Sequence, residues 1–476
     1  MSTKDKEKDN ISADLKKSLF YTKKTVLETA NENLKQSITD FCEDYKHFIS
    51  TAKTERLVVD KAVDIAKQNG FVEYTYDNRR TLKSGDKIYL IHRNKAVILA
   101  VIGSDPLDCG INLTIAHGDS PRLDLKGNPV FEDADMAFLQ THYYGGIKKY
   151  QWLSSPLALY GVIIKSDGTK AEINIGDNEN DPVLCISDLL PHLSKDYMSK
   201  TAAEFVSGEA LNVFISSTPF TEDGEKTSDA VKLFILDLLN KKYNITERDF
   251  MSADLSLVPA GKARDVGLDK SMIGGYGQDD RVCVYTELIA LMEITAPKRT
   301  CVTAIADREE IGSSGNTGMN SRFLTSFIEE LSENANVKLR DVLRNSRCLS
   351  ADVNAAFDPN YPNVLEKNNA SYAGSGVVVT KYTGVRGKSE TSEASAEFLS
   401  YVFNLFDKNK ITWQTGMLGK IDAGGGGTVA KYVAEMDIEV VDVGVPVLGM
   451  HSLFELTAKT DVYMAYKAFK AFNESL

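Results

Sequence analysis

The most constraining feature of this 476-residue chain is an apolar run that ends in two adjacent glutamates. The run from Cys301 to Ala306 leads into Asp307-Arg308-Glu309-Glu310-Ile311-Gly312 and then into a turn rich in glycine and serine. Neighbouring carboxylates repel each other, so a strand end that carries both is costly unless a cation neutralises one and leaves the other free to handle protons. The alternative interpretation of the pair taken alone is a solvated acidic turn.

Composition limits the kind of protein that this chain can be. The length predicts two or three domains with a sizeable buried core. A hydrophobic content of 43% with 26% charged residues is typical of a globular protein, and no apolar stretch approaches the roughly 18 residues of a membrane helix. The formal charge of −12, without a basic stripe interleaved with aromatic residues, argues against a nucleic-acid partner.

The first residues and the cysteines indicate the cellular compartment that we expect for the protein. The first ten residues are charged and lack the apolar core of a signal peptide. The six cysteines are scattered without any C-x-x-C pair, as expected of buried thiols in a reducing environment. We therefore expect a cytoplasmic protein that does not associate with membranes.

The apolar spacing predicts a separate module in the middle of the chain. Helical periodicity extends from Leu15 to Asn69, and hairpin patterns follow at 88–102 and at 162–175. The region 125–250 otherwise lacks alternating strands and long helices and is predicted to be a separate, partly β module.

The part of the chain after this module alternates helices and strands. Helices are predicted at 284–294 and 323–331, strands at 301–306 and 348–351, and two more helices at 398–405 and 456–472. This order predicts a mostly parallel mixed sheet with helices on both faces.

Several candidate metal ligands lie just past predicted strands, at the sheet edge where open α/β folds bind ligands. They are His117, the Glu309-Glu310 pair, Asp352 and His451. A further carboxylate, Asp280, lies in a glycine-rich loop before a helix, where a helix cap is the alternative role. Asp119, two residues after His117, can orient the imidazole by accepting its second N–H.

This donor set predicts a metal centre. Imidazole and carboxylate ligands suit zinc, cobalt or manganese. Five ligands are one too many for a single tetrahedral zinc ion, and one shared carboxylate would let two ions lie about 3.5–4 Å apart. Glu309, next to the ligand Glu310, is then placed to act as general base and acid.

The same residues carry a resemblance to a known family. His117-Gly118-Asp119-Ser120-Pro121-Arg122-Leu123-Asp124, Gly277-Gln278-Asp279-Asp280-Arg281, the Asp307–Gly312 segment, Asp352-Val353-Asn354 and Gly449-Met450-His451-Ser452 are similar to the motifs of the aspartyl aminopeptidase family of dinuclear metallo-aminopeptidases. They occur in that family's order and extend from about residue 80 to the end of the chain.

The resemblance implies a discontinuous catalytic domain of the zinc-peptidase α/β type, formed by residues 1–124 and 251–476. It also implies that 125–250 is an inserted, β-rich oligomerisation domain and that the protein forms a tetrahedral dodecamer. It assigns Asp280 as the carboxylate shared by two ions, His117 and Asp352 as ligands of one, and Glu310 and His451 as ligands of the other. Glu309 corresponds to the general base and Asp119 to the acid that orients His117. The implied reaction is hydrolysis of the first peptide bond of short peptides by water activated between the two ions.

Two segments depart from the family pattern. The family's histidine after Gly-Gly-Ile is absent here, where Lys148-Lys149-Tyr150-Gln151-Trp152 follows, and Ser375-Gly376 stands in place of the lysine of a His-Lys-Gly segment associated with acidic side chains. A preference for N-terminal Asp or Glu is therefore open. The candidate compensating cations are Lys148, Lys149, Lys381, Arg386 and Lys388.

Two smaller expectations and three alternative functions remain. The glycines 424–427 would let a peptide backbone approach the metals closely or would form a structural turn, and Trp152 is expected in a core or an interface. The alternative functions are a related metallo-deacylase, a carboxypeptidase, and a non-catalytic self-assembling cargo or scaffold protein.

Overall fold

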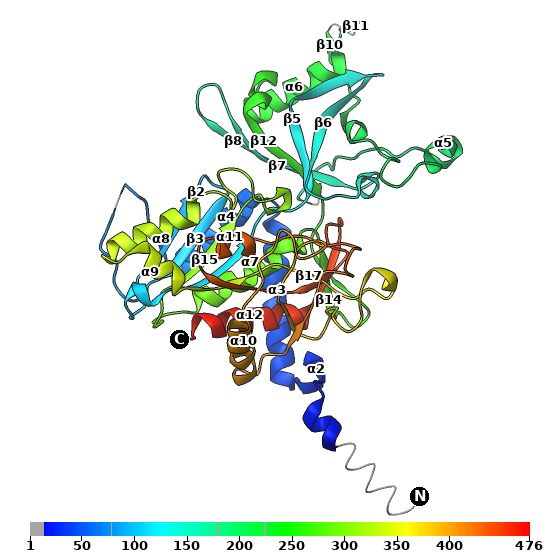
Figure 1. Cartoon of the computed structure of the whole chain (residues 1–476). Helices are drawn as coiled ribbons and strands as arrows, with labels where there is room; N and C mark the ends of the chain where they lie inside the picture. The colour runs from blue at the N-terminus through cyan, green and yellow to red at the C-terminus, as the bar shows by residue number, and fades with distance from the viewer. Residues whose placement is uncertain (1–13, 78, 179, 223–224) are drawn as a thin grey trace, which may run out of the picture.

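A computed structural model describes residues 14–77, 79–178, 180–222 and 225–476 (Figure 1). Its main sheet has nine strands in the order β1-β2-β3-β15-β4-β16-β20-β18-β19. The strands are β1 (Val72–Glu73), β2 (Lys87–His92), β3 (Ala96–Val101), β15 (Cys301–Ala306), β4 (Asn112–His117), β16 (Arg347–Ser350), β20 (Glu439–Gly444), β18 (Val377–Thr380) and β19 (Trp413–Thr415).

The centre of the main sheet is parallel. Strands β15, β4, β16 and β20 pair in parallel, whereas β3 and β18 join this block in antiparallel orientation. Both β15 and β4 are buried along their whole length, which agrees with the continuous apolar run Cys301–Ala306. The predicted mixed, mostly parallel sheet is confirmed.

Helices cover both faces of the main sheet. Helices α3 (Glu32–Thr51), α4 (Glu55–Gln68), α7 (Gln278–Met292), α10 (Ala396–Lys408) and α12 (Lys459–Asn473) contribute to one apolar cluster. Helices α8 (Phe323–Asn334), α9 (Leu339–Arg344) and α11 (Ala430–Ala434) contribute to the second. Three further helices are α2 (Val26–Thr29), α5 (Lys195–Met198) and α6 (Ala230–Tyr243).

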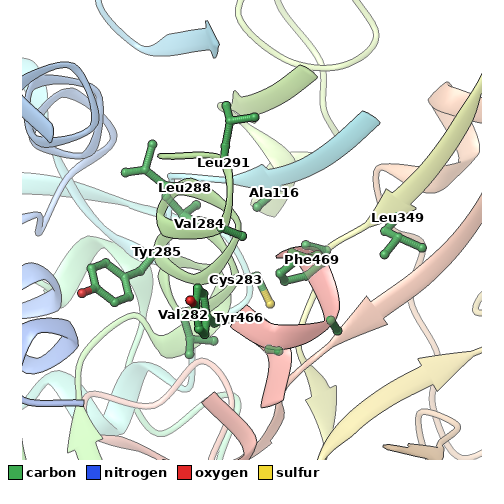
Figure 2. Close-up of a cluster of buried hydrophobic side chains, with 14 of the residues drawn as sticks. Ala116, Val282, Cys283, Val284, Tyr285, Leu288, Leu291, Leu349, Tyr466 and Phe469 are labelled. Atoms are coloured by element: carbon green, nitrogen blue, oxygen red, sulfur yellow. The ribbon is translucent and has the colours of Figure 1, made fainter. Parts of the chain in front are cut away.

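Helix α7 is central to the first cluster. Almost all of its residues are buried, because it packs against β4 on one side and against α3 and α12 on others. Figure 2 shows side chains of α7, among them Val284 and Leu288, in one buried cluster with Ala116 of β4 and Phe469 of α12. This packing fixes the N-terminal end of α7 beside the end of β4, where His117 lies.

A second sheet of six strands lies at the top of Figure 1, in the order β8-β7-β12-β5-β6-β9. Its strands are β5 (Arg122–Asp133), β6 (Met136–Tyr144), β7 (Leu157–Ile164), β8 (Lys170–Ile175), β9 (Val213–Ser216) and β12 (Ala253–Pro259). The sheet extends beyond the expected limits of 125–250 at both ends. Trp152 is 1% exposed within its apolar core, in agreement with the core expectation.

Two further sheets complete the described part of the chain. A five-stranded sheet has the order β13-β14-β22-β21-β17, and β10 pairs with β11. These strands are β10 (Thr221–Glu222), β11 (Glu225–Lys226), β13 (Arg264–Val266), β14 (Met272–Gly275), β17 (Asn354–Ala355), β21 (Pro446–Leu448) and β22 (Glu455–Ala458). The predicted helix from Leu456 is corrected here, because Glu455–Ala458 pairs as β22 and the helix begins at Lys459.

No helix in the described ranges is both long and apolar enough to cross a membrane.

Candidate metal centre

Two groups of potential metal ligands share one residue. His117, Asp279 and Asp352 form one group, and Asp279, Glu310 and His451 form the other. Within each group the donor atoms lie within 4.8 Å of one another. Each group has three imidazole or carboxylate donors, and the two groups share one carboxylate. Such an arrangement is suited to two divalent transition-metal ions.

The main sheet positions three of these residues. His117 is the last residue of β4, Asp352 follows β16 by two residues, and Glu310 lies in a short 3₁₀ turn that begins three residues after β15. Because β15, β4 and β16 are parallel neighbours, their carboxyl ends meet at one edge. The structure thus brings these predicted ligands together, and His451 joins them from the segment after β21.

Asp279, rather than the predicted Asp280, lies between the two histidines. Its Oδ1 is 3.2 Å from His117 Nε2 and its Oδ2 is 3.1 Å from His451 Nε2. The backbone of both aspartates is non-helical at the start of α7, so these successive carboxylates reach different neighbours. The carboxylate common to both groups of potential ligands is therefore Asp279, whereas the sequence analysis expected Asp280.

Asp280 instead lies behind His117. The backbone N–H of His117 donates a hydrogen bond to Asp280 Oδ2 at 3.4 Å, and the side chain is fully buried. Burial raises the pKa of Asp280 well above its usual range, and His117 opposes this shift. Asp280 therefore supports the strand end from within the core.

Asp119 connects four groups of the site. His117 Nδ1 lies 3.0 Å from the carbonyl oxygen of Asp119 and 3.3 Å from its Oδ1. The backbone N–H groups of Glu309 and Glu310 donate to the same carboxylate at 3.1 and 3.2 Å, and the Tyr144 hydroxyl donates at 2.8 Å. These contacts direct His117 Nε2 toward Asp279, as expected of a residue that orients a metal-binding histidine.

Glu309 is positioned differently from Glu310. Its Oε2 lies 3.9 Å from His117 Nε2, and its side chain is 18% exposed at the wall of a cavity. Burial raises the pKa of Glu309 to about 7, with His117 opposing the shift. A carboxyl group with a pKa near neutrality is suited to accept and return a proton.

Sequence reasoning missed three groups that hold the candidate ligands. Glu455 accepts hydrogen bonds from the backbone N–H of His451 at 2.7 Å and of Asp279 at 3.3 Å. The carbonyl oxygen of Gly146 lies 2.9 Å from His451 Nδ1, and Tyr144 bonds to Asp119. Only the Gly145-Gly146-Ile147 motif gave a signal for this region, because Tyr144 and Glu455 lie in strands whose pairing the sequence does not reveal.

The donor set fits metal ions on independent grounds. Glu310 Oε1 is buried without a hydrogen-bond partner, which is costly for a carboxylate. Burial raises the pKa of Glu310 and of Asp352 well above the usual carboxyl range, and neighbouring aspartates raise both further. Cations at this position would relieve both the missing partner and the repulsion.

A cavity of about 510 Å³ opens onto these residues. Asp279, Glu309, Glu310, Asp352 and His451 contribute to its wall. Three of the four consecutive glycines, 425–427, also line it, in agreement with their expected proximity to the site. Among the described lining residues the only lysine or arginine is Lys431, so none of the five compensating cations predicted from the sequence borders this cavity.

Comparison with known proteins identifies the family. The model of the Aminopeptidase I zinc metalloprotease (M18) family matches residues 48–473. The chain belongs to the M18 family of aminopeptidases. A probable M18 family aminopeptidase 1 of Clostridium acetobutylicum is 48% identical over 434 residues, which cover 90% of this chain and 93% of that protein.

Solved structures agree with this assignment. An M18 aminopeptidase from Thermotoga maritima is 42% identical with a TM-score of 0.91, and aminopeptidase I from C. acetobutylicum is 43% identical with a TM-score of 0.90. Each match covers 96% of this chain and 100% of the other. The mApe1 dodecamer of Saccharomyces cerevisiae, 22% identical, covers 93% of this chain and 97% of its own with a TM-score of 0.73, and it shares the fold.

The contact between Tyr144 and Asp119 predicts a measurable effect. Tyr144→Phe removes one donor to Asp119 and frees the carboxylate that orients His117. We expect metal affinity or activity to fall by about 10- to 100-fold, as measured by metal titration and peptide turnover. Tyr143→Phe, at an exposed neighbouring position, is the control and should change neither; equal effects of the two variants would contradict the proposed role of Tyr144.

Proposed function

We propose that this metal-dependent M18 aminopeptidase removes the N-terminal residue of short peptides at a centre for two divalent cations. The observation that carries the proposal is the position of Asp279. Its Oδ1 faces His117 of one ligand group, and its Oδ2 faces His451 of the other. A carboxylate shared in this way is the usual link between two ions a few ångströms apart.

The proposed ligands follow from the two groups. His117 and Asp352 hold one ion, Glu310 and His451 hold the other, and Asp279 contributes to both. Zinc agrees best with the family and with the donor types, and cobalt or manganese are compatible with the same donors. Asp119 and Glu455 fix the orientation of the ligands without binding an ion.

The chemistry divides between the ions and one free carboxylate. When bound, such ions polarise a carbonyl group and lower the pKa of water. Glu309 is the proton carrier: its Oε2 takes a proton from the attacking water and returns it to the leaving amine. The hydrogen bond from the Glu309 N–H to Asp119 holds this side chain beside the ligands.

We further propose that the second sheet belongs to an oligomerisation domain, inserted at about 125–250, and that the protein assembles as a dodecamer in the cytoplasm. The apolar side chains of Leu233 and Leu238 on α6 are exposed in the single chain, which is consistent with an interface. The mApe1 relative forms a dodecamer. All six cysteines are free, which is consistent with a reducing compartment.

Recognition of a free amine distinguishes this activity from a deacylase or a carboxypeptidase. We expect the zinc-loaded protein to release the first residue of a free tripeptide and to leave the N-acetylated peptide intact. Chromatography of the products identifies which bond breaks. Release of acetate would indicate a deacylase, and release of the C-terminal residue would indicate a carboxypeptidase.

The two adjacent aspartates provide a matched test of the shared ligand. Asp279→Asn should lose most bound metal, because the amide cannot replace a carboxylate that serves two ions. Asp280→Asn should retain it, since burial already favours the protonated form of Asp280. Elemental analysis after dialysis measures both, and the reverse result would restore Asp280 as the shared ligand.

Glu309 is tested by a change that preserves shape. Glu309→Gln should keep the metal content and lower kcat by about 10²- to 10⁴-fold, the range for loss of a general base. Steady-state kinetics and metal analysis on the same preparation separate turnover from metal binding. Unchanged turnover would refute the assignment.

A further inference from the structure

We propose that the ion pair between Lys431 and Glu390 makes this aminopeptidase select substrates with an uncharged N-terminal side chain. The inference rests on the proposed function and adds the substrate class. It concerns the part of the cavity that the metal ligands do not occupy.

Both residues line the same cavity as the candidate ligands. Lys431 lies in α11, immediately after the glycine-rich segment, and Glu390 lies in the loop before α10. Lys431 Nζ donates to the Glu390 carboxylate, and their side chains are 32% and 69% exposed. The pair therefore faces a space that solvent or a substrate side chain can enter.

The charges of the cavity leave this pair as the deciding electrostatic feature near the opening. Six carboxylates line the cavity. Four of them, Asp279, Glu309, Glu310 and Asp352, would be balanced by two divalent ions. A fifth, Asp442, is buried and accepts hydrogen bonds from the hydroxyl groups of Ser350 and Thr428 at 2.7 and 2.8 Å. Lys431 is the only lysine or arginine among the described residues of the wall, and Glu390 neutralises it.

Backbone packing explains why the two side chains meet. The Gly384 N–H donates to the Gly426 carbonyl at 2.5 Å. A Cβ at Gly425 would lie 2.1 Å from the Gly384 carbonyl oxygen, and one at Gly427 would lie 2.8 Å from the carbonyl oxygen of Glu390. The loop that carries Glu390 can approach this segment so closely only because the segment lacks side chains.

The loop is also closed at its base. The Thr383 N–H donates to Thr391 Oγ1 at 2.9 Å, and Val385 and Ser389 exchange backbone hydrogen bonds at 3.1 and 3.0 Å. Glu390 is consequently presented to Lys431 by a constrained turn. The consecutive glycines thus serve to assemble the pair as well as to line the cavity.

A charged N-terminal side chain would have to break this pair. An acidic side chain would compete for Lys431 with Glu390, which the loop holds in place at high effective concentration, and a basic side chain would compete for Glu390 with Lys431. Either one would lose hydration without gaining a free counter-charge. An uncharged side chain avoids this cost.

The proposal predicts that substitutions of Glu390 and of Lys431 shift the substrate preference toward opposite charges. With zinc-loaded wild-type protein, Gln-Ala should be hydrolysed with a kcat/KM at least about 10-fold above that of Glu-Ala, a difference of about 1.4 kcal/mol. Glu390→Gln should raise the Glu-Ala to Gln-Ala ratio by about 10-fold or more, because Lys431 is freed. Lys431→Met should raise the ratio of Lys-Ala to norleucyl-Ala, because Glu390 is freed.

Glu393→Gln is the matched control. Glu393 lies in the same part of the chain and pairs with Lys388 at 2.8 Å, outside the residues that line the cavity. The Glu393→Gln substitution changes the net charge by the same amount as Glu390→Gln. It should leave the ratio of kcat/KM for Glu-Ala to kcat/KM for Gln-Ala unchanged. Equal responses of the two variants would overturn the local role of Glu390.

Three other outcomes also overturn the proposal. They are a wild-type protein that prefers Glu-Ala over Gln-Ala, a Glu390→Gln variant whose activity changes equally for all substrates, and a gain confined to Ala-Glu, which would place the pair opposite the second residue. If no dipeptide is hydrolysed, the proposed function fails separately. Calorimetry of free L-glutamate and L-glutamine binding to the zinc-loaded wild type and to Glu390→Gln then still tests the side-chain selection. A relative gain in L-glutamate affinity in the variant would support the proposal, and no gain would oppose it.

Discussion

The geometry of the candidate metal centre depends on the contacts of one carboxylate, that of Asp119. It accepts hydrogen bonds from Tyr144 and from the backbone N–H groups of Glu309 and Glu310, and it lies against His117 Nδ1. One buried anion therefore fixes the ends of β4 and β15 and the last residue of β6 relative to one another. Three donors and the imidazole around one carboxylate compensate its burial and leave little freedom for the imidazole.

Much of the fold follows from local patterns in the sequence. The continuous apolar run Cys301–Ala306 predicts a strand buried on both faces, and the structure places it at the centre of the main sheet as β15. Strand ends in a parallel block meet at one edge, so His117, Glu310 and Asp352 could be predicted to converge without knowledge of the strand order. The chemistry of the donors then predicts a metal centre.

The remaining features depend on tertiary structure. Nothing in the Asp279-Asp280 pair tells which carboxylate faces the histidines, because that depends on non-helical backbone at the start of α7. Glu455 holds His451 and Asp279 from β22, a strand that helical periodicity in the tail conceals. The limits of the second sheet depend on the pairing of β5 with β12, which joins residues far apart in the sequence.

The second sheet is physically part of the centre. Its strand β6 ends at Tyr144, which bonds to Asp119, and the Gly146 carbonyl two residues later lies against His451 Nδ1. A side chain at Gly146 would also meet the imidazole, since a Cβ there would lie 3.2 Å from His451 Nδ1. Any displacement of β6 relative to β4 therefore changes the surroundings of both histidines at once. If the second sheet forms the proposed interface, assembly would restrict that displacement and so would help to hold the geometry of the candidate metal centre through Tyr144 and Gly146.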